Sequence, residues 1–187
     1  MLKNTLYYFY DFAYDIDNAI KKRYHMSKVC CIIPAEEDVS DGVSNDEIFR
    51  VIARITHDFG IDSFIIGTNL GMEQNILEYL IFSRNTAKKF TITGVIGAEE
   101  AATIWSETQR NRFFSLVACC DYELLLHPMH SDLAEFYKNL VIVDLADLIF
   151  IIGKDENLEY WVKKRNKKLL KFDLEDKVLV PNITLLS

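Results

Sequence analysis

The stretch from Phe64 to Leu80 constrains the fold of this chain more than any other segment. It begins with the apolar run Phe64–Gly67, and a second glycine, Gly71, opens an amphipathic segment. The apolar residues of that segment recur at helical spacing: Met72, Ile76, Leu77 and Leu80. This order predicts a strand, a tight turn and a helix, which is the repeating unit of a parallel sheet.

The same alternation of apolar runs and amphipathic segments extends over most of the chain. We expect strands at 28–33, 64–67, 90–96, 123–126 and 148–152, and two further short apolar runs follow at 169–172 and 178–180. We expect helices at 44–59, 72–85, 106–120, 131–141 and 155–165. Ser44 with Glu47 and Ser106 with Gln109 have capping-box spacing, which predicts where two of these helices begin. Strictly alternating strands and helices predict an α/β fold, a doubly wound and mostly parallel sheet with helices on both faces.

Residues 1–24 precede the first expected strand, so we interpret them as a helical extension of a single domain at 25–187. Their apolar positions form a wide seam: Leu6, Phe9, Phe12, Ala13, Ile16 and Ile20. A seam of that width needs a cover. It either caps the domain or lies between subunits, and we favour a homodimer because two-fold contacts satisfy such surfaces most often.

Composition excludes several classes of partner. The chain has 187 residues, of which 50% are hydrophobic, and a net charge of −7. This charge argues against broad binding to nucleic acid or to an anionic membrane. The sequence has no apolar run long enough to span a membrane, and it does not open with a secretory pattern. Both observations favour a cytoplasmic protein. The adjacent pairs Cys30-Cys31 and Cys119-Cys120 lie in apolar segments, and we interpret all four cysteines as buried, reduced thiols.

The turn after Phe64–Gly67 is the predicted ligand site. Parallel sheets bind ligands at the carboxyl ends of their strands, and a helix N-terminus next to glycine accepts anionic groups. Thr68 and Asn69 have side chains suited to a ribose or a phosphate. Glu73, in the first helical turn, either complements the helix N-terminus or contacts the ligand. Neither a P-loop nor a dinucleotide fingerprint occurs, and we expect no cofactor and no metal, since His127 and His130 are poorly spaced for one.

Several short motifs together resemble a known family. They are Gly67-Thr68-Asn69-Leu70-Gly71-Met72-Glu73, Trp105, Asp121-Tyr122, and Lys138-Asn139 ahead of Asp147-Leu148-Ile149-Phe150. In this order they resemble the YpsA-like branch of the SLOG superfamily over residues 28–173. The resemblance implies a Rossmann-like domain that binds a nucleotide or a nucleotide-derived ligand. It implies binding roles for Gly67, Asn69, Gly71, Glu73 and Asn139.

The chain departs from this family at its second glycine-rich motif. The sequence Gly153-Lys154-Asp155-Glu156-Asn157 stands there, with one glycine and two acids. Acidic residues at that turn oppose a phosphate and argue against phosphoribohydrolase activity. We therefore expect a non-catalytic or sensor-like domain. The alternatives are a hydrolase or transferase acting on an N-glycosidic bond, with Glu73, Glu99 or Glu100 as the catalytic carboxylate, and an interaction protein that has lost its ligand.

Overall fold

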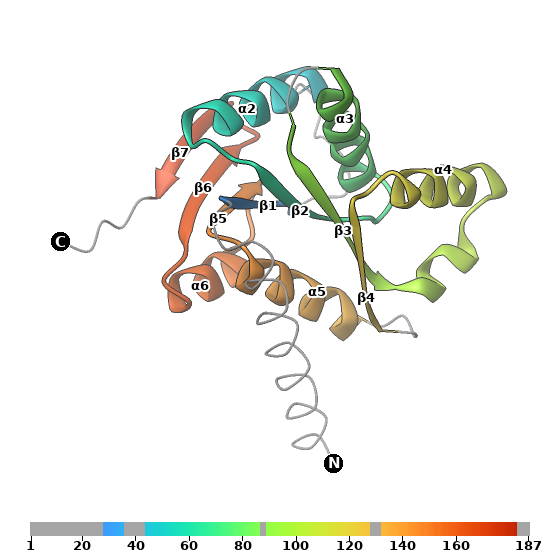
Figure 1. The fold of residues 1–187 in the computed structure, drawn as a ribbon. Coiled ribbons are helices and arrows are strands. Elements are labelled where there is room, and N and C mark those ends of the chain that lie inside the picture. Colours follow the sequence, from blue (N-terminus) through green and yellow to red (C-terminus); the bar gives the residue numbers. More distant parts are fainter. Residues whose placement is uncertain (1–27, 36–43, 87–88, 128–131, 183–187) are drawn as a thin grey trace, which may run out of the picture.

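The computed structural model describes residues 28–35, 44–86, 89–127 and 132–182, which form one seven-stranded sheet flanked by helices (Figure 1). The strands are β1 (Val29–Pro34), β2 (Ser63–Gly67), β3 (Thr91–Ala98), β4 (Tyr122–His127), β5 (Leu148–Ile152), β6 (Lys168–Asp173) and β7 (Val178–Asn182). The α-helices are α2 (Asn45–Asp58), α3 (Met72–Thr86), α4 (Glu107–Ala118), α5 (Asp132–Leu145) and α6 (Glu156–Lys164). A 3-10 helix, η1 (Glu99–Ile104), follows β3.

The strand order is β4-β3-β2-β1-β5-β6-β7, and every neighbouring pair is parallel except β6 with β7. From β1 the chain steps outward to β4, then returns through α5 to place β5 on the other side of β1. Because parallel connections are right-handed, this reversal puts α5 and α6 on the face opposite α2 and α3 (Figure 1). The fold is thus a Rossmann-like, doubly wound α/β sheet, as the alternation predicts.

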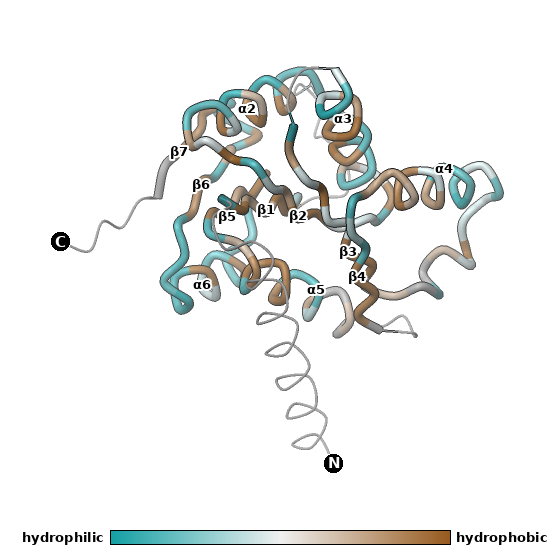
Figure 2. The backbone as a smooth tube through the Cα atoms, in the orientation of Figure 1, coloured by the Kyte–Doolittle hydropathy of each residue, from teal (hydrophilic) through white to brown (hydrophobic). Residues whose placement is uncertain are grey.

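Two apolar layers, one on each face, hold the helices to the sheet. Consecutive side chains of a strand point to opposite faces, so Cys30 and Ile32 pack against α2 and α3, while Cys31 and Ile33 pack towards α5 and α6. The strand β5 is buried along its whole length. Figure 2 shows the resulting hydrophobic centre, with the central strands brown and the outer turns largely teal. This explains why the central strands are continuous apolar runs.

The predicted helix starts are confirmed in detail. Ser44 accepts a hydrogen bond from the backbone N–H of Glu47, whose carboxylate accepts one from the N–H of Ser44, at 3.3 and 3.1 Å. Ser106 and Gln109 form the same reciprocal pair at the start of α4. Side-chain oxygens at these positions satisfy N–H groups that the helix itself leaves unpaired.

Other expectations need correction or lie beyond the described residues. Cys119 is exposed, because α4 ends at Ala118 and Cys119 caps it, and Cys120 is only partly buried. The expectation of four buried thiols is therefore wrong at Cys119 and only partly met at Cys120. The predicted N-terminal extension, residues 1–24, lies outside the residues that the structure describes. Within the described residues, no helix is long and apolar enough to cross a membrane.

Candidate functional site

The predicted turn lies at the carboxyl end of β2, beside the central strand β1. Gly67 is in register with Val95 of the neighbouring strand β3. The hydroxyl of Thr68 donates a hydrogen bond to the carbonyl oxygen of Val95 at 3.3 Å, which ties the start of the turn to β3. Thr68 is almost fully buried, whereas Asn69 is partly exposed. The turn is therefore anchored at its first residue and accessible at its second.

A buried ion pair closes the turn. The Glu73 carboxylate accepts a hydrogen bond from the Asn69 backbone N–H at 2.7 Å and one from the Lys138 ammonium at 2.6 Å. Glu73 is 8% exposed and Lys138 is fully buried at 0%. Glu73 lies on α3 and Lys138 on α5, so the pair joins the helix layers on opposite faces of the sheet. Both carboxylate oxygens are engaged, one with each partner.

The two glycines of the turn serve different physical purposes. A Cβ atom at Gly67 would lie 2.2 Å from Oε2 of Glu73 and 2.4 Å from Oε1. Gly67 therefore leaves the space that the Glu73 carboxylate fills. Gly71 has φ of +85°, a left-handed conformation that residues with a Cβ rarely adopt. Gly67 is thus needed for space, and Gly71 for backbone conformation.

The residues that follow Glu73 and Lys138 in the sequence, Gln74 and Asn139, are both amides. Gln74 is fully buried, and its Nε2 donates a hydrogen bond to the Thr68 carbonyl oxygen at 3.2 Å. Its Oε1 is buried without a hydrogen-bond partner among the described residues. The same holds for Oδ1 of Asn139, which follows Lys138 on α5. Glu73 and Gln74 thus both hold backbone groups of the turn, at Asn69 and at Thr68.

The structure brings most of the predicted ligand-binding residues into one turn. Gly67, Thr68, Asn69, Gly71 and Glu73 are contiguous there, and Asn139 is on the helix whose Lys138 reaches Glu73. Their binding roles stay predictions. Of the other two carboxylates considered for catalysis, Glu100 is exposed on η1, and the Glu99 side chain is not among those described.

The second, acidic turn has a local structural explanation. Gly153 is buried with φ of +93°, and the Asp155 carboxylate accepts a hydrogen bond from the Leu158 N–H at 2.9 Å. Asp155 is thus the N-cap of α6. Lys154 pairs with Glu175 at 2.9 Å. Asp155 therefore has a structural role at this turn as a helix cap, and Lys154 forms an exposed ion pair.

Sequence reasoning missed Lys138 as the partner of Glu73. The buried positions of α5 include Ala134, Lys138 and Ile142, spaced four apart, whereas Phe136 is 39% exposed. A lysine between Ala134 and Ile142 at helical spacing was the available signal, since a lysine in an apolar stripe needs a buried partner.

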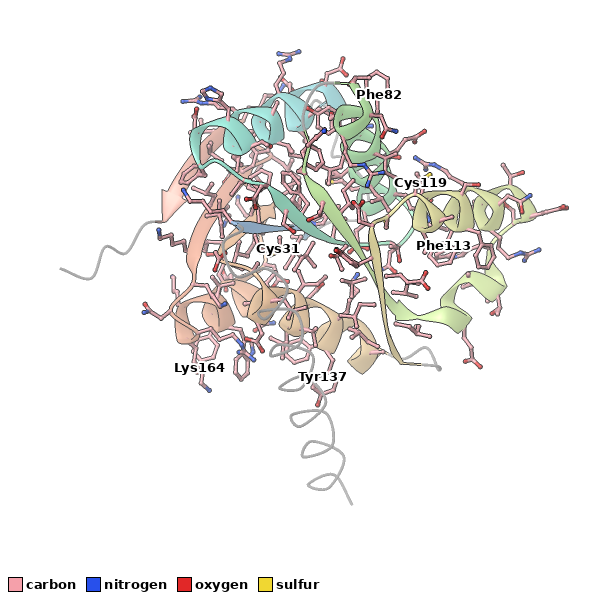
Figure 3. The ribbon with its side chains drawn as sticks, viewed as in Figure 1. Cys31, Phe82, Phe113, Cys119, Tyr137 and Lys164 are labelled. Carbon is pink, nitrogen blue, oxygen red and sulfur yellow. The ribbon has the colours of Figure 1, made fainter. Side chains whose placement is uncertain are left out.

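The described cysteines are free thiols, and burial determines their protonation. Figure 3 shows Cys31 at the centre of the molecule, between the sheet and α5. Burial raises the pKa of the Cys30 and Cys31 thiols well above its ordinary value, and that of Cys120 to about 11. These three thiols are therefore protonated at neutral pH and poor nucleophiles. In the described part of the chain, no three His, Cys, Asp or Glu side chains gather as metal ligands would.

Neither a scan of protein-family models nor a search of the curated proteins finds a match to this chain.

Proposed function

We propose that this chain binds a nucleotide or a nucleotide-derived small molecule at the Gly67–Glu73 turn, in a non-catalytic or sensor-like role. The observation that supports it most is the buried Glu73–Lys138 pair at the carboxyl edge of the sheet. A buried ion pair generally stabilises a protein no more than apolar residues of similar volume. Its position at the edge where doubly wound sheets bind ligands favours a functional reason for it.

The geometry favours binding over catalysis by Glu73. A nucleophilic or basic carboxylate needs a lone pair directed at the substrate. Each oxygen of Glu73 already accepts one hydrogen bond, from the Asn69 N–H and from Lys138, and the side chain is almost fully buried, which leaves little access for a substrate. An N-glycosidic hydrolase or transferase is therefore less well supported than a binding domain. The resemblance to the SLOG superfamily supports the class of ligand.

Thermal unfolding in the presence of ligands tests the proposal. Ribonucleosides, their 5′-mono- and diphosphates and cyclic nucleotides form the panel. A ligand that binds the folded chain at 100 times its Kd stabilises it by about 2.7 kcal/mol, which raises Tm by several degrees. We expect at least one member of the panel to do so. A panel in which no member shifts Tm contradicts the proposal.

A matched pair of variants then localises the site. Asn69→Ala removes a partly exposed amide from the turn, and Asn157→Ala removes an exposed amide from α6. By calorimetry we expect Asn69→Ala to weaken binding of the stabilising ligand by about tenfold, the loss expected of one or two hydrogen bonds. Asn157→Ala should bind like the original chain. Equal affinities in both variants would place the ligand elsewhere.

We also propose that the protein is a cytoplasmic homodimer. The wide apolar seam from Leu6 to Ile20 supports the dimer. The free thiols of the four cysteines support the cytoplasm, where thiols are kept reduced. Patches of this size are commonly covered by a second copy of the same chain.

A further inference from the structure

A run of basic residues lies at the end of α6 and the start of β6. Five of its six positions are Lys or Arg, in the order Lys163-Lys164-Arg165-Asn166-Lys167-Lys168. Over the whole chain, in contrast, Asp and Glu outnumber Lys and Arg by 28 to 21. Because β5 and β6 are parallel, α6 returns the chain to the amino edge of the sheet. The basic run therefore lies at the edge opposite the Gly67–Glu73 turn.

Two of the five cations hold the fold together. Arg165 pairs with the Asp144 carboxylate of α5. The Lys167 ammonium donates hydrogen bonds to the backbone carbonyl oxygens of Asp144 and Ala146, at 2.9 and 2.7 Å. Carbonyl groups at the end of a helix have no partner within the helix, so Lys167 satisfies a structural need. Arg165 and Lys167 thus join the end of α6 to the end of α5.

The other three cations, Lys163, Lys164 and Lys168, are exposed, and none of them is paired with an acid within the described part of the chain. The acids of the same helix do not neutralise them. Glu156 begins the helix at its far end, and Glu159 already accepts a hydrogen bond from a lysine of β6 at 2.6 Å. Attraction to the carboxyl end of α6 does not explain all three, because Lys168 lies in β6.

Aromatic side chains adjoin these lysines. The Lys164 ammonium lies 4.4 Å from the centroid of the Trp161 ring and 5.9 Å from that of Tyr160. Figure 3 shows Lys164 on the outer side of α6, away from the sheet. Tyr160 is 58% exposed, which is unusual for so large a ring. Tyrosine is enriched among the residues that dominate protein–protein binding, so an exposed ring beside three cations is suited to a partner with both acidic and apolar groups.

The size of this surface favours a short anionic partner. Its three exposed cations lie within six positions of the chain, and at physiological ionic strength a charge acts over about 8 Å. A long nucleic acid or an anionic membrane would extend beyond that range onto a molecule with a net charge of −7, which repels it. A short acidic peptide segment can place its carboxylates at the lysines alone.

We infer that the end of α6 and the start of β6 form a docking surface for a short acidic segment of a partner protein. This surface, the α6 patch, consists of Tyr160, Lys163, Lys164 and Lys168. The lysines pair with Asp or Glu side chains of the segment, and the Tyr160 ring contacts an apolar side chain between them. Because the α6 patch and the Gly67–Glu73 turn lie at opposite edges of the sheet, this interaction does not depend on the function proposed for the turn.

Selection from a random twelve-residue peptide library displayed on phage tests the inference without assuming a sequence. The full chain is the target. We expect the selected peptides to contain more Asp and Glu than the unselected library, together with an aromatic or aliphatic residue. The most enriched peptide is then synthesised with a fluorescent label, and its Kd is measured by anisotropy. The Kd should rise with salt concentration, as for contacts between charged groups.

A triple variant, Lys163→Gln/Lys164→Gln/Lys168→Gln, locates the peptide. An exposed ion pair contributes up to about fivefold in affinity, so we expect this variant to bind the peptide at least about tenfold more weakly. The matched control makes the same change of net charge at three exposed cations outside the α6 patch: Arg50, Arg54 and Lys89. The control should bind within about twofold of the original chain.

Tyr160→Ala tests the apolar half of the surface. It removes a largely exposed ring, and we expect a loss of about fivefold or more in affinity, as for a residue at the centre of an interface. A selection without an excess of acidic residues overturns the inference. Equal affinity losses in the two triple variants also overturn it, because net charge alone would then explain binding. A twelve-nucleotide oligouridylate, or vesicles with 30% phosphatidylserine, that bind the α6 patch more tightly than the peptide would assign the surface to nucleic acid or membrane instead.

Discussion

At the scale of single residues, the Glu73–Lys138 pair explains why Gly67 is a glycine. The sequence suggested that both glycines of the turn let a ligand approach the backbone. The structure shows that a side chain of the protein occupies the space at Gly67, and that Gly71 is required by its positive φ. Spacing along the chain could not distinguish these purposes, because the partner of Glu73 is 65 positions away.

A substitution at Gly67 tests this explanation. Gly67→Ala should push the Glu73 carboxylate away from Lys138 and leave two buried charges poorly compensated. Breaking a buried pair typically costs about 3–5 kcal/mol, and we expect a loss of unfolding free energy of that order in urea titrations. In the double variant Glu73→Ala/Lys138→Met the carboxylate is gone, and adding Gly67→Ala should cost less than about 1 kcal/mol.

The comparison between the two backgrounds decides the outcome. An equally large loss from Gly67→Ala in both would mean that the Cβ clashes with something other than Glu73. A small loss in both would mean that the carboxylate moves aside without consequence.

At the scale of elements, the sequence predicted the strands and helices to within a few residues. The strands β1, β2 and β5 are largely apolar because they are buried on both faces, and their short length between turn residues favoured strands over helices. The capping boxes at Ser44 and Ser106 marked two helix starts. The η1 helix and the antiparallel pairing of β7 were missed, since short segments carry little periodicity.

The turn between β6 and β7 carries a prediction about pH. The Asp173 carboxylate accepts hydrogen bonds from the backbone N–H groups of Asp176 and Glu175, which lower the pKa of Asp173 below its ordinary value. A lowered pKa in the folded state adds stability above the unfolded pKa, about 3.9 for Asp. That stability is lost as the pH falls through the folded pKa. Asp173→Ala should therefore unfold at lower urea concentration than the original chain at pH 7, with the two converging towards pH 2.

Asp176→Ala is the control for this prediction, because it leaves the backbone N–H of residue 176 in place. Urea midpoints measured at several pH values should show little pH-dependent difference for this variant. A difference between Asp173→Ala and the original chain that stays constant down to pH 2 would contradict the assigned cause.

At the scale of the whole molecule, the doubly wound topology followed from the alternation of elements, but the strand order did not. The order depends on which strands pair, and in this fold the pairing is set by α5 packing back across β3, β2 and β1. The amphipathic pattern at 131–141 predicted that a helix forms there, but it did not predict which residues of the helix are buried. This is why Lys138 could not be placed from the sequence.

The proposed homodimer is tested on the same scale. Light scattering should give the full chain a mass near twice 21.7 kDa, and a variant lacking residues 1–22 the mass of one shortened copy. In a monomer of the full chain the apolar seam would be exposed to water, and dimerisation covers it. A variant without the seam has no such surface to cover and should stay monomeric. A full-length chain that is monomeric at high concentration excludes the dimer. A shortened variant that remains dimeric places the contact elsewhere.

The distance in sequence between Glu73 and Lys138 has a consequence for synthesis of the chain. The two side chains are 65 residues apart, and a ribosome adds about 5–20 residues per second. The carboxylate is therefore made roughly 3–13 seconds before the amine that neutralises it. During that interval the nascent chain contains Glu73 without Lys138. The β1–β3 half therefore cannot form the buried ion pair by itself. The ion pair at this edge of the sheet can form only after α5, which carries Lys138, has been synthesised.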